Sequence, residues 1–166
     1  YPVQDPSRVY FGTDTRISTM LVGAALAIVW APWRLSARIP REGRFVLGVS
    51  CAPVYGELAW AERGAGAWLG DQRIRVSSTA QLGATILSTG NLKTLAQGPR
   101  WARFGALVPQ LSRLRGYGDF VHYHLLARGA LDVVLESDVN ILDIAALTVI
   151  VEEAGGRFSD ASGTSR

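Results

Sequence analysis

The stretch NILDIAALTVIVEEAGG, residues 140–156, decides the fold. It predicts one helix that is apolar on nearly every side, with Asp143 in its first turn and Gly155–Gly156 at its end. A helix of this kind has to be buried in a larger core. The β-like segment Leu131–Leu135 precedes it, and residues 136–140 read as the loop between the two.

Upstream of this helix, strands and helices alternate. Ala84–Ser88 and Leu114–Tyr117 are predicted strands. Two helices are predicted: Pro99–Leu111, from apolar residues at helical spacing, and Phe120–Ala127, which Asp119 could cap and which Gly129 would end. Strands that alternate with helices imply a partly parallel sheet.

Residues 43–76 have a different pattern, with short alternating strands and turn residues between them. The segments read as strands are Arg44–Ser50, Gly56–Glu62, Gly64–Asp71 running into a turn, and Arg73–Val76. This is an antiparallel meander. The predicted fold class is therefore α/β, a layered α+β sandwich in which an antiparallel meander is followed by strand–helix units.

The front of the chain, residues 1–42, is irregular. Its one sustained feature is the apolar run Met20–Trp33, which is shorter than the about 20 residues that a transmembrane helix needs. We expect a buried strand or core helix there and no membrane partner. The chain thus divides into an altered or irregular front segment, 1–42, and residues 43–166, which together should form one structural unit.

Composition narrows the functional classes. With 48% hydrophobic and 19% charged residues, the 166-residue chain can bury a core. Its net charge of +3 comes from scattered arginines, with Lys93 the only lysine, so nucleic acid is not an expected partner, whereas small anions are. Cys51 is the only cysteine, which excludes an internal disulfide and a thiolate metal cage and favours the cytoplasm.

Asp143 carries the main chemical signal. It follows a strand and a loop and lies in the first turn of a helix, where free backbone N–H groups and the helix dipole favour negative charge. A carboxylate there can ligate a metal ion beside a phosphate, because ligands of open α/β folds collect at the carboxyl ends of strands. It can equally be a simple helix cap.

Residues 143–146 and 153–156 resemble the carboxy-terminal signature of the inositol monophosphatase family, W-D-x-A-A followed by apolar residues and E-A-G-G, with Leu142 in place of the usual tryptophan. The likeness extends over roughly residues 43–160 and includes Arg63–Ala67 and Ile74–Ser77. Within the family, Tyr117–Phe120 followed by Glu136 looks most like the histidinol-phosphate phosphatase branch.

This resemblance implies a phosphomonoesterase that acts on a small phosphorylated substrate with Mg²⁺, which activates water and polarises the phosphate. It makes Asp143 a magnesium ligand and places Gly118, Asp119 and Glu136 against the organic part of the substrate. Asp119 could instead be a helix cap and Glu136 a solvated loop acid. Histidinol phosphate is the favoured substrate and an inositol or sugar phosphate the alternative; a homodimer is also implied.

The family's D-P-x-D-G-T motif is altered at the front of the chain. Aligning Gly12–Thr13 with its G-T makes Thr13 the residue that positions the attacking water, but it puts Arg8 and Phe11 at the two aspartate positions. Aligning Asp5–Pro6 with its D-P instead puts Arg8 at the second aspartate position. Neither side chain can ligate magnesium. The sequence therefore predicts that this polypeptide alone releases little phosphate, and a non-catalytic remnant that binds a ligand or partner is the other reading.

Two other catalytic readings have less support. His122 and His124 lie two residues apart on a predicted helix, so they do not share a face, and a core or surface role is expected for them. The sequence has no G-x-S-x-G elbow of a serine hydrolase.

Overall fold

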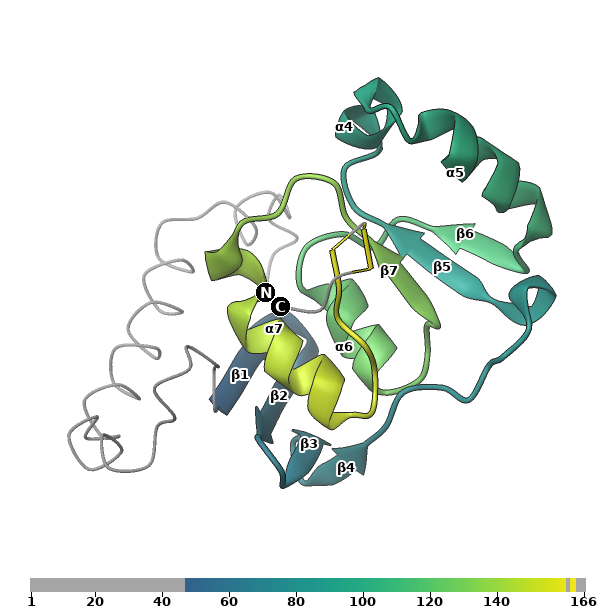
Figure 1. The fold of residues 1–166 in the computed structure, drawn as a ribbon. Coiled ribbons are helices and arrows are strands. Elements are labelled where there is room, and N and C mark those ends of the chain that lie inside the picture. The colour runs from purple at the N-terminus through teal and green to yellow at the C-terminus, as the bar shows by residue number, and fades with distance from the viewer. Residues whose placement is uncertain (1–46, 161, 164–166) are drawn as a thin grey trace, which may run out of the picture. The chain divides into compact units, whose positions relative to one another are not determined.

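The computed structural model describes residues 47–160 and 162–163 (Figure 1). The strands are β1 (Leu47–Ala52), β2 (Glu57–Glu62), β3 (Gly66–Leu69), β4 (Gln72–Ile74), β5 (Ile86–Thr89), β6 (Arg113–Arg115) and β7 (Val133–Leu135). The helices are α4 (Leu92–Gln97), α5 (Trp101–Leu107), α6 (Val121–Ala127) and α7 (Ile141–Glu153), with 3-10 turns η1 (Pro53–Tyr55), η2 (Leu82–Ala84) and η3 (Val108–Gln110). The predictions for the irregular front, Met20–Trp33 and Thr13 lie outside the described residues.

The first sheet confirms the antiparallel meander. Its four strands are ordered β1-β2-β3-β4, and each pairs antiparallel with its neighbour. Strand alternation separates its two faces: Ala59 and Ala61 of β2 are fully buried, while Trp60 between them points to the other face. There Trp60 stacks on Trp68 of β3, its direct partner in the register, with ring centroids 4.4 Å apart.

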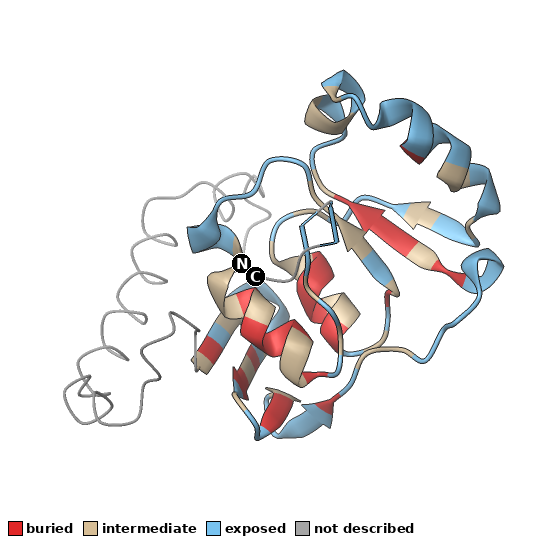
Figure 2. Ribbon diagram, in the orientation of Figure 1, coloured by how far each residue is buried: buried red, intermediate tan, exposed pale blue. Residues whose placement is uncertain are grey.

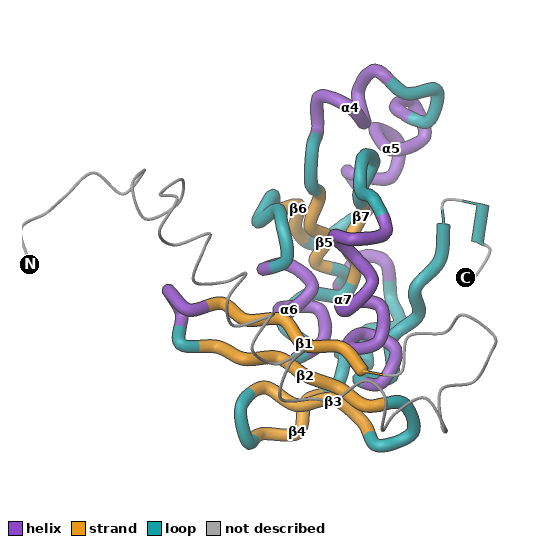
Figure 3. Tube along the Cα trace, turned by 90° about the vertical axis from the view of Figure 1, so that its left-hand side faces the viewer, coloured by secondary structure: helices purple, strands orange, loops and turns teal. Residues whose placement is uncertain are grey.

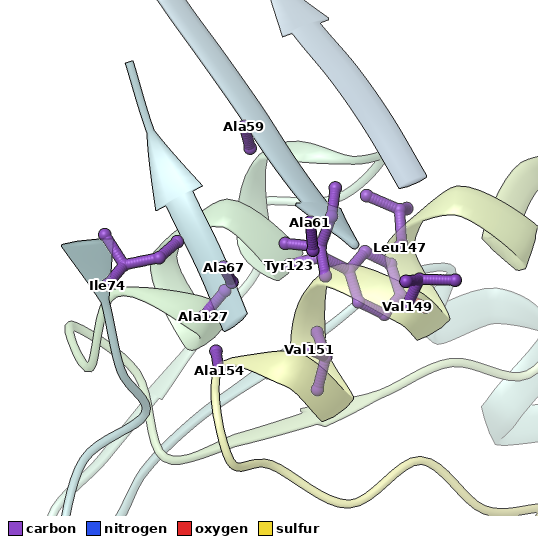
Figure 4. Close-up of a cluster of buried hydrophobic side chains, with 11 residues drawn as sticks. Ala59, Ala61, Ala67, Ile74, Tyr123, Ala127, Leu147, Val149, Val151 and Ala154 are labelled. Atoms are coloured by element: carbon purple, nitrogen blue, oxygen red, sulfur yellow. The ribbon is translucent and has the colours of Figure 1, made fainter. Parts of the chain in front are cut away.

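The core lies between this sheet and α7. Figure 4 shows small strand side chains meeting larger helix side chains. Ala59, Ala61 and Ala67 face Leu147, Ile150 and Val151, and Tyr123, Ala127 and Ala154 complete the contact. Alanines let the helix approach closely, and at Gly48 of β1 even a Cβ would overlap the Ala146 carbonyl oxygen of α7. The apolar surface of α7 is therefore explained by its burial.

The second sheet confirms the parallel part. Its order is β6-β5-β7, and β5 pairs parallel with both neighbours. Figures 1 and 3 show α6 and α7 between the two sheets and α4 and α5 beyond the three-stranded one. As Figure 2 shows, burial is concentrated in α6, α7 and the central strands, while α4 and α5 are mostly exposed.

Three predicted details differ. The predicted helix Pro99–Leu111 is shorter, because α5 ends at Leu107 and Pro109, which has no N–H, lies in the 3-10 turn that follows. Helix α4, only six residues long and capped by Asn91, was not predicted. Phe120, not Asp119, holds the N-cap position of α6, so the N-cap alternative for Asp119 is wrong.

Gly129 follows the C-cap of α6 with φ 76°, as predicted for a residue that ends a helix. In the part of the chain that the structure describes, we find no helix long and apolar enough to cross a membrane.

Candidate functional site

The carboxyl ends of the three parallel strands meet at one edge of their sheet. β5 ends at Thr89, β6 at Arg115 and β7 at Leu135, and the loops that follow carry Gly90, Tyr117–Asp119 and Glu136. Ligands of open α/β sheets bind at such edges. Two of the predicted substrate-binding segments, Gly118–Asp119 and Glu136, therefore fall where the topology favours a site.

Glu136 is not a solvated loop acid, because its side chain is only 10% exposed. Oε1 lies 2.9 Å from Nε2 of His122, off the line of an ideal hydrogen bond. Burial raises the pKa of Glu136, as do the nearby charges of Asp138 and Asp119, while a hydrogen bond from the Asn91 backbone N–H opposes them. The Glu136 carboxylate packs closely against Gly90, where an added Cβ would overlap it.

The loop after β7 is tied to the start of α4. Asn91 Nδ2 donates to Asp138 Oδ2 at 2.9 Å, and Thr94 Oγ1 donates to the same oxygen at 3.1 Å. Ser137 Oγ donates to the Asn91 carbonyl oxygen at 3.1 Å. These bonds hold the segment that follows Glu136, and the Gly90 N–H donates to the Leu135 carbonyl oxygen just before it, at 3.1 Å, so the carboxylate has a fixed position.

Gly118 and Asp119 both have left-handed backbone conformations, with φ of 66° and 46°. Glycine adopts this region freely, and aspartate is one of the few other residues that tolerate it. The charge of Asp119 affects the pKa of both His122 and Glu136. The structure thus brings the two predicted substrate-binding acids into one electrostatic neighbourhood.

Asp143 is part of a capping box at the start of α7. Its Oδ2 accepts a hydrogen bond from the Asn140 backbone N–H at 3.2 Å, and Asn140 Oδ1 accepts from the Leu142 N–H at 2.8 Å. The capping alternative is therefore confirmed. It does not exclude the metal reading, since a carboxylate has two oxygens and this residue is exposed.

Tyr123 connects Asp143 with the acids of the sheet edge. Its side chain is buried, and burial raises its pKa, to which the charges of Glu136 and Asp143 add. The charges of both carboxylates thus oppose ionisation of the same phenol. Leu142, beside Asp143, is 88% exposed, so within the described residues it does not provide the packing that a tryptophan would.

A magnesium ion would find only part of its ligands here. Asp143 offers a hard carboxylate oxygen, of the kind that Mg²⁺ prefers. Across residues 47–160 and 162–163, no three His, Cys, Asp or Glu side chains form a group that could hold a metal ion. The described residues thus fit one ligand of an ion and not a complete two-ion centre.

His122 and His124 lie in the core, which is one of the two positions, core or surface, that the sequence predicted for them. Both are buried, at 0% and 1% exposure. Burial lowers the pKa of His122 to about 4, against the opposing charge of Asp119, and it also lowers the pKa of His124. His122 contacts Ser88 and Glu136, a connection that spans segments too distant in sequence for spacing to indicate.

The second half of the signature has structural roles. Glu153 accepts hydrogen bonds from the backbone N–H groups of Gly64 and Gly66, both at 3.0 Å, and so holds the β2–β3 turn against α7. Gly155 has φ 91°, and a Cβ on Gly156 would lie 2.8 Å from Val151 Cγ1. These contacts explain E-A-G-G as a motif that ends and anchors the helix.

An antiparallel meander packed on two helices, with acids gathered at the edge of a parallel sheet, defines the class, and comparison of the sequence with known families agrees. The sequence model of the Inositol monophosphatase family matches residues 39–166, so the chain belongs to this family. The histidinol-phosphatase of Mycobacterium tuberculosis is 37% identical over 136 residues, which cover 79% of this chain and 52% of that protein.

A solved structure, an IMPase from Thermotoga maritima, superimposes with a TM-score of 0.67 and 33% identity, covering 75% of this chain and 48% of that one. The chain therefore spans about half the length of these relatives. The peptidoglycan O-acetyltransferase OatA of Listeria monocytogenes is 53% identical over 49 residues, 30% of this chain and 8% of that protein. Thr13 lies ahead of the family match and outside the described residues, so its role stays a prediction.

Proposed function

We propose that this chain carries the substrate-recognising part of a magnesium-dependent phosphomonoesterase that acts on histidinol phosphate. The observation that carries the proposal is the position of Asp119 and Glu136 in loops at the same edge of the parallel sheet, with Glu136 Oε1 2.9 Å from the buried His122. Similarity to the M. tuberculosis histidinol-phosphatase over most of the chain supports it.

The proposed division of roles follows from charge. Histidinol carries an ammonium group and an imidazole, and two carboxylates at the sheet edge, Asp119 and Glu136, attract such a cationic group. Asp143 would give one oxygen to a bound ion. A bound magnesium ion would polarise the phosphate and activate water.

An inositol phosphate is the second candidate substrate. It is supported by the 31% identity, over 132 residues, to the inositol-1-monophosphatase of Mesorhizobium japonicum. Its organic part is neutral, so two acids would recognise it only by accepting hydrogen bonds from its hydroxyls. The charge of the site favours histidinol phosphate.

A calorimetric panel on the full chain tests the proposal. In the presence of Mg²⁺, we expect histidinol phosphate to bind at least about tenfold more tightly than inositol 1-phosphate. One additional well-placed ion pair between the ligand and the acids is enough for a difference of this size. The variant Glu136→Gln should reduce this preference, and Asp143→Asn should remove the effect of Mg²⁺. Equal affinities for the two ligands would contradict the substrate assignment.

Turnover is a separate question, because the described residues complete no two-ion centre. We expect the purified chain with Mg²⁺ and histidinol phosphate to release phosphate far more slowly than about one per second, a rate at the low end for ordinary enzymes. Phosphate release is the measurement. A rate above that value would contradict the expectation and would also remove the remaining alternative, a remnant that only binds a ligand or partner.

A further inference from the structure

A buried polar chain links the two loops of the substrate-binding edge. The Tyr117 backbone N–H donates to Ser88 Oγ at 3.2 Å, and Ser88 Oγ lies 3.3 Å from Nδ1 of His122. On the other side of the ring, Nε2 lies 2.9 Å from Glu136 Oε1. Ser88 and His122 are both 0% exposed, so no water competes for these contacts.

Ser88 Oγ can donate to Nδ1 of His122 or accept from it, and the Glu136 carboxylate decides between the two tautomers, because an ionised carboxylate only accepts. Because Ser88 Oγ accepts from Tyr117, its own hydroxyl hydrogen can be given to Nδ1 of His122. A neutral imidazole that accepts at Nδ1 carries its proton on Nε2, the nitrogen that faces the Glu136 carboxylate. In this arrangement Nε2 directs its proton toward the acid, off the line of an ideal hydrogen bond, and Nδ1 offers the serine an acceptor.

Replacing the histidine by an apolar residue would leave two polar groups without their partner in the interior. Glu136 would lose the N–H nearest to Oε1, and the Ser88 hydroxyl would lose its acceptor. A buried acceptor or donor left unsatisfied is costly, so both side chains would be expected to move. Such a movement would shift Glu136 and the Tyr117–Asp119 loop together.

We propose that Ser88 and His122 are positioning residues that fix the Glu136 carboxylate relative to the Tyr117–Asp119 loop and thereby set recognition of the organic part of the substrate. This inference rests on the proposed function of the same edge. Neither residue touches the phosphate or the ion in this proposal; each acts through the group it holds.

His124 provides a matched control on the same helix. It is equally buried, but its Nε2 lies 2.8 Å from Ser50 Oγ of β1 and its Nδ1 lies 3.6 Å from Glu57 Oε2 at the start of β2. A substitution there disturbs the core on the side of the antiparallel sheet and leaves the substrate edge intact. Effects of general destabilisation should therefore be the same at both histidines.

The test is a titration of the full chain with L-histidinol, followed by NMR of the backbone amides at pH 7.5. His122→Phe, which removes both ring nitrogens and keeps a planar ring, should weaken binding at least about tenfold. His122→Gln, which keeps an N–H near the place of Nε2, should stay within about threefold of the wild type. Ser88→Ala, a smaller change, should weaken binding by more than His124→Phe, which should have little effect.

A second readout is independent of any ligand. Side-chain ¹⁵N spectra should show His122 neutral at pH 7.5 with its proton on Nε2, and Glu136→Gln should shift that signal. A proton on Nδ1, or an imidazolium, would overturn the inference. Thermal unfolding of each variant shows that it is folded before its affinity is compared.

The outcomes separate the inference from the proposed function. If the wild type binds histidinol but His122→Phe and His124→Phe weaken it equally, the positioning role is overturned and the proposed function stands. If it binds inositol 1-phosphate instead, with the same pattern among the variants, the positioning role stands and the substrate assignment fails. If the wild type binds neither, both are overturned.

Discussion

At the scale of single residues, the site depends on how Glu136 is confined. His122 lies beside one oxygen of the Glu136 carboxylate, and the Asn91 backbone N–H donates a hydrogen bond to this carboxylate. Gly90 leaves space for the carboxylate that a side chain at position 90 would occupy. Burial then works on both partners: it raises the pKa of Glu136 and lowers that of His122. Each group is therefore biased toward its neutral form, and the histidine is neutral near pH 7.

This bias predicts a pH dependence of stability. The pKa of His122 is about 4 in the folded state and 6.5 in the unfolded chain, so between these values the unfolded chain binds more protons. The contribution of neutral His122 to the free energy of unfolding is therefore complete above pH 6.5. It is lost as the pH falls toward 4, by at most about 3 kcal/mol. Urea unfolding of the wild type should show this decline.

The variant His122→Gln isolates the effect. The raised pKa of Glu136 acts in the opposite direction, stabilising at low pH and losing that contribution as the pH rises. Because Glu136 is present in both proteins, the difference between them reports mainly on the histidine. Parallel pH profiles of the wild type and His122→Gln would contradict the assignment of a depressed pKa to His122.

Gly90→Ala tests the confinement itself. The added Cβ would overlap the Glu136 carboxylate, so the acid must move, at an expected cost of about 1–3 kcal/mol in the free energy of unfolding and with weakened histidinol binding. Gly105→Ala in α5 is the control, since its Cβ would meet no heavy atom within 4 Å. That variant should be slightly more stable and should bind as the wild type does.

At the scale of elements, α7 joins the core to the site. Its middle packs on the strands of the antiparallel sheet, its last turn anchors the β2–β3 turn through Glu153, and its first turn presents Asp143. The first turn is held by the reciprocal bonds of Asn140 and Asp143. The position of the proposed metal ligand therefore depends on the helix cap.

Separate substitutions distinguish capping from metal binding. Asn140→Ala removes a side-chain cap and should lower the free energy of unfolding by about 1 kcal/mol, because the Leu142 N–H loses its acceptor. Asp143→Asn keeps an oxygen for the Asn140 N–H and should cost only about 0.5 kcal/mol, chiefly through the lost charge at the helix start. Chemical denaturation without metal measures both. A larger cost for Asp143→Asn than for Asn140→Ala would contradict this expectation and would mean that the charge of Asp143 stabilises the start of the helix more than the Asn140 cap does.

The contact of α7 with β1 gives a further prediction. A Cβ at Gly48 would overlap the backbone carbonyl of Ala146, which cannot rotate away as a side chain can. Gly48→Ala should therefore separate helix and sheet and destabilise the fold by about 2 kcal/mol or more. Gly83→Ala, where a Cβ meets no heavy atom within 4 Å, is the matched control in a thermal unfolding series. Equal midpoints would contradict the close packing.

The elements that could be predicted from the sequence are those whose signal is local. Helix α7 has length, two glycines after its end and an acid in its first turn, and β1–β4 have alternation and turns. Helix α4 was missed because its six residues are too few for an apolar period.

The acids of the site could be predicted only through the family motif. The buried contacts that hold Glu136 in position could not be predicted at all. His122 touches Ser88, 34 positions away in the chain, and Glu136 beyond β7. Such contacts arise from the register of the parallel sheet, which no local pattern specifies.

At the scale of the whole molecule, the family match begins at residue 39 and the chain spans about half of its relatives. The described residues hold the proposed substrate-recognising edge and one candidate ligand, Asp143, and they contain no group of three His, Cys, Asp or Glu side chains that could hold a metal ion. We therefore expect a divalent ion to bind at the start of α7, beside the acids of the sheet edge.

Paramagnetic NMR tests that claim most directly. Adding Mn²⁺ with inorganic phosphate to the full chain should broaden first the amide signals around residues 140–144 and 118–119, and excess Mg²⁺ should reverse the broadening. Asp143→Asn should abolish it, while Asn140→Ala should retain it. Broadening centred on another part of the chain, or unchanged in Asp143→Asn, would contradict the account.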